Sequence, residues 1–187
     1  MTLETPRLIL RRWMESDAAE LYLHAKNPHV GPAAGWPPHK NQEESLQIIR
    51  TVLSGAENYA LVLKETELPV GCIELMKEGS ACLHMTDTER ELGYWLAEPY
   101  WGQGLMCEAV EVLLWHAFVY MGCSALWCGY LEGNSRSRRV QEKCGFLYSH
   151  SAENRPQSSG EKQTEHFSRL TREQWKSLQR SSPDCPL

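Results

Sequence analysis

The sequence has no apolar run close to the roughly 20 residues that a membrane-spanning helix needs, so we expect no membrane attachment. Its net charge of −5 lacks the basic excess typical of nucleic-acid-binding proteins, and we expect no nucleic-acid partner. The seven cysteines form no CxxC pair and no disulfide framework, and the seven histidines show no metal-ligand spacing. The N-terminus also lacks the basic-then-apolar order of a secretory signal, so we expect reduced thiols, no bound metal and a cytoplasmic protein.

The 187 residues, 42% of them hydrophobic and 23% charged, suffice for one domain with its own core. We expect this domain over residues 1–180, followed by a flexible tail at residues 181–187. Apolar periodicity predicts strands at residues 7–13, 59–64, 70–76, 91–97, 125–131, 146–150 and 163–170. It predicts helices at residues 16–27, 41–55, 103–121 and 134–144 and from residue 171 onward. The segment GPAAGWPP at residues 31–38 and the polar segment 152–161 are predicted loops.

The most informative segment, residues 91–111, has the sequence ELGYWLAEPYWGQGLMCEAVE. It predicts a strand, a Pro/Gly turn and an amphipathic helix, with a further strand at residues 125–131 completing a right-handed crossover between parallel strands. A helix N-terminus presents unpaired N–H groups and partial positive charge, and Gly102 and Gly104 allow close backbone approach. The segment therefore predicts an anion site suited to a phosphate or diphosphate.

Taken alone, this turn fits more than one function. The run from Gly102 to Cys107 nearly matches the dinucleotide-binding fingerprint, with Cys107 at the place of the third glycine. That fingerprint also needs an acidic residue about 20 positions later, and Glu132, the only fit, lies 28 residues after Gly104. A P-loop is absent, because the sequence contains no GxxxxGK[ST]. A tight turn without a ligand remains an alternative.

Further motifs in a fixed order favour one family. The run PYWGQGLMCEA is followed about 30 residues later by Asn134-Ser135-Arg136-Ser137 and then by Glu142-Lys143-Cys144-Gly145-Phe146. TPRLILRR at the start, VGCIEL in the middle and ELGYWL before the turn complete the pattern over roughly residues 5 to 175. The whole resembles the GNAT acetyltransferases, and most closely the RimJ/RimL type, which acetylates ribosomal-protein N-termini.

The resemblance implies a mixed α/β fold, with a twisted, mostly antiparallel sheet that splits at one parallel strand pair and has helices on both faces. Acetyl-CoA would lie in that split, its diphosphate on main-chain amides and its pantetheine arm beside the first strand. The residues that the resemblance assigns to acetyl-CoA are Leu96, Ala97, Trp101, Gly102, Gln103, Gly104, Leu105, Met106, Cys107, Asn134 and Ser137. The sequence departs from the general motif Q/R-x-x-G-x-G/A at Trp101 and at the bulky Met106.

The implied chemistry is direct acetyl transfer from the thioester to an amine, a step that benefits mainly from orientation. The amine must be neutral to attack, whereas a free α-amino group has a pKa of about 7.7–8.0, so a base helps. The resemblance points to Glu91 as that base, with Glu74 as its rival; each is alternatively a surface carboxylate. An N–H near Leu96 would donate to the developing oxyanion.

Departure of the CoA thiolate needs a group that donates a hydrogen bond to its sulfur. Many GNAT enzymes use a tyrosine where this chain has Gln141, and the RimL-like branch points instead to Ser137, which is alternatively only a first-turn residue of its helix. Asn134 is alternatively only a helix cap. Arg136, Arg138 and Arg139 would meet the 3′-phosphate of CoA or form a solvated face. Trp36, in the loop of residues 31–38, would border the acceptor site together with Glu74 and Glu91.

The expected function is therefore acetyl transfer from acetyl-CoA to a primary amine, either a protein N-terminus or a small molecule, in a ternary complex. Two other classes remain open. One is a nucleotide-cofactor oxidoreductase, and the other is a non-catalytic acyl-CoA-binding module. A homodimer is expected by analogy with the family.

Overall fold

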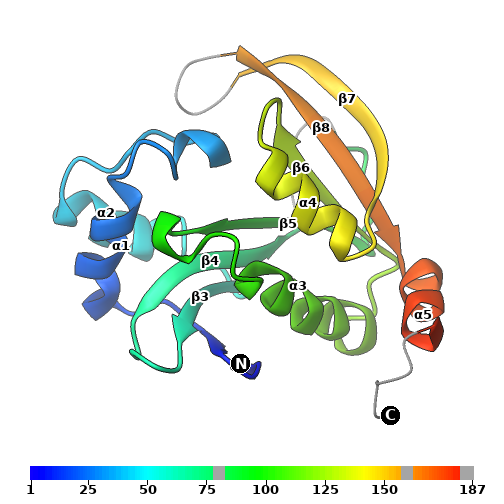
Figure 1. Cartoon of the computed structure of the whole chain (residues 1–187), viewed down its shortest axis with the longest axis horizontal. Coiled ribbons are helices and arrows are strands. Elements are labelled where there is room, and N and C mark those ends of the chain that lie inside the picture. The colour runs from blue at the N-terminus through cyan, green and yellow to red at the C-terminus, as the bar shows by residue number, and fades with distance from the viewer. Residues whose placement is uncertain (78–82, 157–161, 182–187) are drawn as a thin grey trace.

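An eight-stranded sheet forms the centre of the protein, with strand order β1-β2-β3-β4-β5-β6-β8-β7 (Figure 1). The computed structural model describes residues 1–77, 83–156 and 162–181. Of the predicted tail at residues 181–187, Ser181 is helical and residues 182–187 lie outside the described residues. The strands of the sheet are β1 (Leu3–Glu4), β2 (Leu8–Arg11), β3 (Asn58–Leu63), β4 (Pro69–Met76), β5 (Glu89–Leu96), β6 (Ala125–Leu131), β7 (Leu147–Pro156) and β8 (Lys162–Thr171). All neighbouring strands are antiparallel except β5 and β6, which are parallel, and this confirms the predicted topology.

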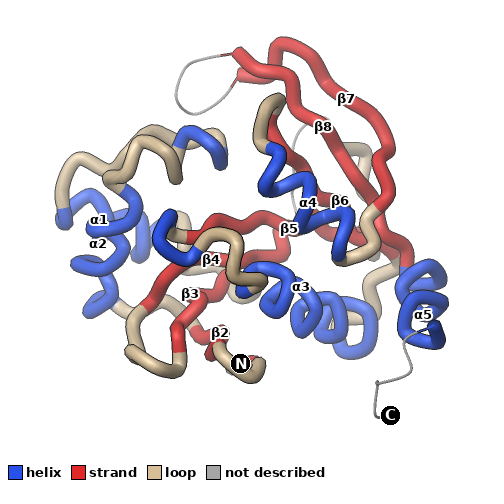
Figure 2. Tube along the Cα trace, in the orientation of Figure 1, coloured by secondary structure: helices blue, strands red, loops and turns tan. Residues whose placement is uncertain are grey.

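The described residues form five α-helices, which surround the sheet (Figure 2). They are α1 (Ala18–Ala25), α2 (Gln42–Thr51), α3 (Leu105–Trp115), α4 (Ser135–Lys143) and α5 (Arg172–Ser181). Short 3-10 turns occur at η1 (Glu15–Asp17), η2 (Pro32–Ala34) and η3 (Glu98–Tyr100), and α3 continues into a π-helical segment, η4 (His116–Tyr120). No helix within the described ranges is long and apolar enough to cross a membrane.

The sheet has a separate apolar core on each face. On one face, Leu61, Ile73 and Leu92 pack against α3 residues such as Leu113. On the other face, the alternating residues of β3 and β4 pack against Trp13, α1 and α2. Because successive strand residues point to opposite faces, the strands β3 and β4 supply both cores. The two helix layers therefore lie on opposite sides of the sheet, as predicted.

Several boundaries differ from the predictions. The long helix starts at Leu105 rather than Gln103, because Gly104 has φ +80°, which is outside the helical range. The loop at residues 31–38 contains the 3-10 turn η2, which Pro32 starts. The final strands are longer than predicted, so the part of the predicted loop 152–161 that the structure describes is strand up to Pro156.

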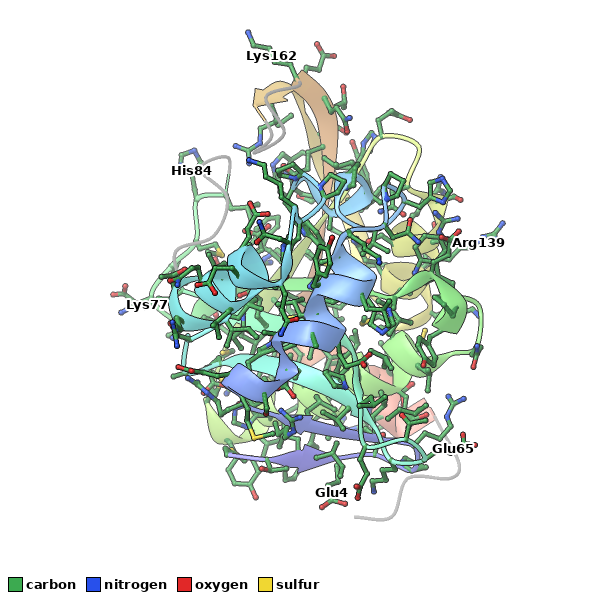
Figure 3. The ribbon with its side chains drawn as sticks, turned by 90° about the vertical axis from the view of Figure 1, so that its left-hand side faces the viewer. Glu4, Glu65, Lys77, His84, Arg139 and Lys162 are labelled. Atoms are coloured by element: carbon green, nitrogen blue, oxygen red, sulfur yellow. The ribbon has the colours of Figure 1, made fainter. Side chains whose placement is uncertain are left out.

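Strands β7 and β8 form a long curved ribbon that extends beyond the rest of the fold (Figure 1), and Lys162 lies at its tip (Figure 3). At its Thr171 end the ribbon is followed by α5, whose Trp175 packs against Phe118. The described cysteines, Cys72, Cys107, Cys123, Cys128 and Cys144, are all free thiols.

The parallel pair β5–β6 is joined over only part of its length. Its register runs from Glu89 opposite Ala125 to Leu92 opposite Cys128. β5 then continues to Leu96 and β6 to Leu131 without further pairing to one another. This separation of the two strands, here called the split, confirms the predicted opening between them.

Candidate active site

The N-terminus of α3 forms the first part of the site, beside the end of β5 (Figure 2). Gly102 and Gly104 have φ of +76° and +80°, conformations that favour glycine. A Cβ added at Gly102 would meet no atom of the described residues within 4 Å, so the turn is open on that side. Asn41 and Asn134 cap α2 and α4 with their side chains, whereas Gly104 has none to accept the first amides of α3. These amides fit a diphosphate.

Arg7 fixes this turn from outside. Its guanidinium forms an ion pair of 2.7 Å with Glu108 on α3 and donates to the Gln103 carbonyl at 3.0 Å. The Thr5 hydroxyl also contacts Glu108. The contacts hold the turn in place at the helix N-terminus. Arg7 was not among the predicted site residues, although it lies in the TPRLILRR motif.

The predicted cofactor residues at the start of α3 would bind a cofactor through their main chain rather than through their side chains. Leu105 and Met106 are buried in the core, so the bulk of Met106 points away from the turn. Cys107 is half-buried, and a hydrogen bond from the Cys144 thiol, with the charge of Lys143 nearby, lowers the pKa of Cys107 to about 7. Gln103 donates its side-chain amide to the Pro99 carbonyl at 2.9 Å.

Two side chains satisfy carbonyl groups that the split would otherwise leave without partners. The Trp101 indole N–H donates to the Leu96 carbonyl at 2.7 Å, and the Gln141 side-chain amide donates to the Gly129 carbonyl at 3.1 Å. Buried main-chain polar groups need such partners. The split is thus a stable feature of the fold, and Gln141, at the family's tyrosine position, helps to maintain it.

Main-chain direction decides which groups of β5 face the split. The Ala97 N–H donates to the Val70 carbonyl of β4 at 2.8 Å, so it points away from the split. Because alternate residues of a strand direct their main-chain groups to opposite neighbours, Tyr94 and Leu96 direct theirs toward β6. The N–H of Leu96 is therefore directed into the split, whereas Ala97 follows the last residue of β5 and directs its N–H to β4.

The three predicted arginines of α4 lie in different places. The Arg136 guanidinium stacks 3.9 Å from the centre of the Trp101 ring, next to the turn. Arg138 forms an ion pair with Glu142 of its own helix, and Arg139 extends into solvent (Figure 3). Only Arg136 is placed beside the glycine turn.

Ser137 belongs to a hydrogen-bonded group between α4 and β5. Its hydroxyl is 3.0 Å from the Tyr94 hydroxyl and 3.4 Å from the Gln141 amide. Burial raises the pKa of Tyr94 well above its ordinary value, so this hydroxyl keeps its proton at neutral pH. The sequence did not single out Tyr94, which the motif ELGYWL contains. The two hydroxyls thus lie within hydrogen-bonding distance of one another between α4 and β5.

Asn134 connects α4 to the loop of residues 31–38 through its side chain. Its side-chain oxygen accepts from the Ser137 N–H at 3.1 Å, which makes it the predicted helix cap. Its side-chain N–H donates to the Ala33 carbonyl at 2.9 Å. The loop of residues 31–38 is thereby attached to the start of α4. Trp36 in this loop is half-buried, with its ring 5.9 Å from that of Trp95.

Glu74 lies on the opposite face of the sheet from α3 and α4. The Asn58 side chain donates to its carboxylate at 2.7 Å. A Cβ added at Gly93, the first residue of β5 after the paired region, would lie 3.3 Å from Oε1 of Glu74. The carboxylate therefore covers Gly93 at the start of the split. Burial raises the pKa of Glu74, although the hydrogen bond from Asn58 acts in the opposite direction.

Glu91 points to the same face but lies within the paired region. Its neighbours across the ladders are Met76 on β4 and Trp127 on β6, and it is 6% exposed. Leu92 separates it from the first residue of the split. The structure therefore brings Glu74, and not Glu91, to the opening between the strands.

Comparison with known proteins identifies this arrangement. The sequence pattern of the Acetyltransferase (GNAT) domain matches residues 7–147. The chain belongs to the GNAT acetyltransferase family. It is thus an N-acetyltransferase, and the family uses acetyl-CoA. This membership gives no support to the alternative of a nucleotide-cofactor oxidoreductase.

Individual relatives agree with this GNAT assignment. The protein named Uncharacterized N-acetyltransferase YoaA of Bacillus subtilis (strain 168) is 24% identical over 149 residues, which cover 77% of this chain and 81% of YoaA. Among solved structures, the fold is similar to ribosomal-protein-S5-alanine acetyltransferase from Vibrio fischeri (TM-score 0.70, 20% identity, 94% and 98% of the two chains). It is also similar to Mycobacterium smegmatis RimJ in complex with CoA-disulfide (TM-score 0.73, 17% identity, 96% and 95%).

Proposed function

We propose that this GNAT protein transfers the acetyl group of acetyl-CoA directly to a primary amine held on the other side of the sheet. The observation that supports this most strongly is the split. It connects the open amides of α3 and the hydroxyls of Ser137 and Tyr94 on one face with the Glu74 carboxylate on the other. Such an opening lets two reactants meet in line, which is the main requirement of direct acyl transfer.

On the α3 side, the amides of residues 102–107 would bind the diphosphate of acetyl-CoA, with Arg136 and Trp101 beside it. The main-chain groups of Tyr94 and Leu96 would pair with the pantetheine arm as an added strand does. The N–H of Leu96 would donate to the thioester carbonyl oxygen as negative charge develops there.

On the other side, Glu74 would accept the proton of the amine, and Asn58 would hold the carboxylate in position. A raised pKa suits a general base, because it strengthens the affinity of the carboxylate for a proton. Glu91 then acts as a buried neighbour of this base. On the α4 side, the Ser137 hydroxyl, supported by Tyr94, would donate a hydrogen bond to the departing thiolate.

The acceptor would approach over the tryptophans of the second face. Trp13 and Trp36 both contact Trp95, which follows Gly93 by two residues on the same face of β5. We propose a protein N-terminus or a small primary amine as acceptor. The similarity to a ribosomal-protein-S5-alanine acetyltransferase makes peptides with a free N-terminal alanine the first to test.

A thiol-release assay tests this function. The purified protein is incubated with acetyl-CoA and a panel of small amines and short peptides with free N-termini, and free CoA is measured against time. Amine-dependent release that Glu74→Gln abolishes supports the proposal. Stabilisation by CoA without release in any mixture would instead indicate a non-catalytic acyl-CoA-binding module, and stabilisation by NADH alone would favour an oxidoreductase.

We also propose a cytoplasmic homodimer. Free thiols at all the described cysteines fit a reducing compartment. Sedimentation equilibrium at micromolar concentration tests the dimer.

A further inference from the structure

A second carboxylate reaches the split, from the strand on the other side. Glu165 of β8 lies next to Leu131 of β6 in the ladder. A Cβ added at Gly129 would lie 2.6 Å from Oε1 of Glu165, so this oxygen rests directly on the Gly129 main chain. The Glu165 side chain is 16% exposed, and its other oxygen accepts from Arg155 of β7 at 3.1 Å. Sequence motifs gave no sign of this residue.

Glu165 and Glu74 occupy corresponding places on the two separated strands. Leu92 and Cys128 form the last pair of the β5–β6 ladder, and their side chains share the α3 face. The following residues, Gly93 and Gly129, therefore both face the acceptor side, because strand residues alternate. Glu74 covers the first of these glycines.

Each glycine is thus covered by a carboxylate that a neighbouring strand supplies, Glu74 from β4 and Glu165 from β8. Each carboxylate is also fixed on its outer side, by Asn58 and Arg155 respectively. The opening of the split toward the acceptor side is consequently bordered by one carboxylate oxygen on each strand.

We propose that Glu165 determines acceptor specificity: together with Glu74 it admits amines with no carboxylate on the neighbouring carbon and rejects free α-amino acids. This inference rests on the proposed acetyltransferase function. An incoming ammonium group is attracted by the two negative carboxylates. The α-carboxylate of a free amino acid would be held a few ångströms from the same carboxylates and would be repelled by them. Unit charges about 4 Å apart near a protein surface interact strongly enough to change rates by about tenfold or more. Peptide N-termini and simple amines lack that charge.

Arg155 binds only one of the two carboxylate oxygens of Glu165, and the other oxygen remains at the split. Arg155 lies on the outermost strand, β7, and is bound to the oxygen that points away from Gly129. The oxygen on Gly129 faces the split, and replacing Glu165 with glutamine removes the negative charge there. This change favours a substrate carboxylate.

The test compares one amine with its carboxylate-bearing analogue, and alaninamide and alanine are the first pair. We expect the wild type to acetylate alaninamide at least about 100-fold more efficiently than alanine, as kcat/KM from thiol release. In Glu165→Gln this ratio falls about tenfold. Comparing ratios between variants cancels the different basicities of the two amines. Glu132→Gln is the matched control, because Glu132 binds His166 and its side chain is 69% exposed; its ratio stays at the wild-type value.

A second variant changes the position of the Glu165 carboxylate without replacing Glu165. The Cβ of Gly129→Ala would displace Oε1 of Glu165, and we expect the ratio to fall as in Glu165→Gln. Gly55→Ala, whose Cβ would make only an ordinary contact of 3.7 Å, is the control. An alaninamide-to-alanine ratio that is near one in the wild type, or unchanged in both folded variants, overturns the inference and leaves the acetyltransferase function standing. Failure of the wild type with every amine rejects that function itself.

Discussion

At the scale of single residues, Glu74 carries the clearest chemical role. Burial raises the pKa of Glu74, and a base acts only when deprotonated. The acid limb of the kcat profile should therefore lie at higher pH than an ordinary glutamate would give, with the rate falling as pH decreases through it. Glu74→Gln should lower kcat at pH 7 by about 100-fold and remove this limb.

Glu91→Gln provides the comparison for Glu74, because Glu91 lies on the same strand face but within the paired region. We expect it to lower turnover by less than Glu74→Gln while leaving acetyl-CoA binding nearly unchanged. Equal losses in the two variants, or an acid limb that persists in Glu74→Gln, would argue against Glu74 as the base. Stopped-flow rates between pH 5 and 9 distinguish these outcomes.

Ser137 gives a second prediction for a single residue. Its hydroxyl would stabilise the departing thiolate, and a hydrogen bond to a charged group contributes roughly 1.5–3 kcal/mol. Ser137→Ala should therefore slow CoA release in a single turnover by about 10-fold or more, with little change in the Kd of acetyl-CoA. Tyr94→Phe should show a smaller loss in the same experiment, since Tyr94 acts through Ser137. An unchanged single-turnover rate in Ser137→Ala would remove Ser137 from the mechanism.

At the scale of secondary-structure elements, the split depends on side chains that satisfy its open carbonyls. Trp101→Phe keeps a ring under Arg136 but removes the hydrogen bond to the Leu96 carbonyl. A main-chain acceptor left without its partner costs roughly 1–3 kcal/mol. We expect the Kd of acetyl-CoA to rise about 10-fold, measured by calorimetry. Trp115→Phe, on an exposed part of α3, is the control and should bind normally.

The elements that the sequence predicts best are those whose boundaries are set by the residues at the boundary itself. The turn at Gly104 and the cap at Asn41 follow from local chemistry, and both are observed. The extent of β7 and β8 depends on cross-strand pairing, which polar residues at their outer ends do not reveal. The two-residue strand β1 exists only because it pairs with β2.

The site shows the same division between local and long-range causes. Main-chain sites such as Gly102 could be predicted, because the backbone conformation is encoded locally. Asn58, Tyr94 and Glu165 could not be assigned from sequence alone, because each meets its partner across strands or between a strand and a helix. The position of Glu74, and not Glu91, at the split likewise depends on the register of β5 against β6, which the local sequence does not encode.

At the scale of the whole molecule, one continuous sheet separates two working faces. Helices α3 and α4 lie on one face and α1 and α2 on the other (Figure 1). The hydrogen bond from the Asn134 side chain to the Ala33 carbonyl joins the loop of residues 31–38 to the start of α4. The split is therefore the place in the described fold where the two substrates would meet.

The structure of the protein with bound CoA tests this central claim most directly. We predict a diphosphate on the amides of residues 102–107, a pantetheine arm between β5 and β6, and a sulfur next to the Ser137 hydroxyl. A CoA molecule bound elsewhere, or a glycine turn that stays empty at saturating CoA, would contradict the account.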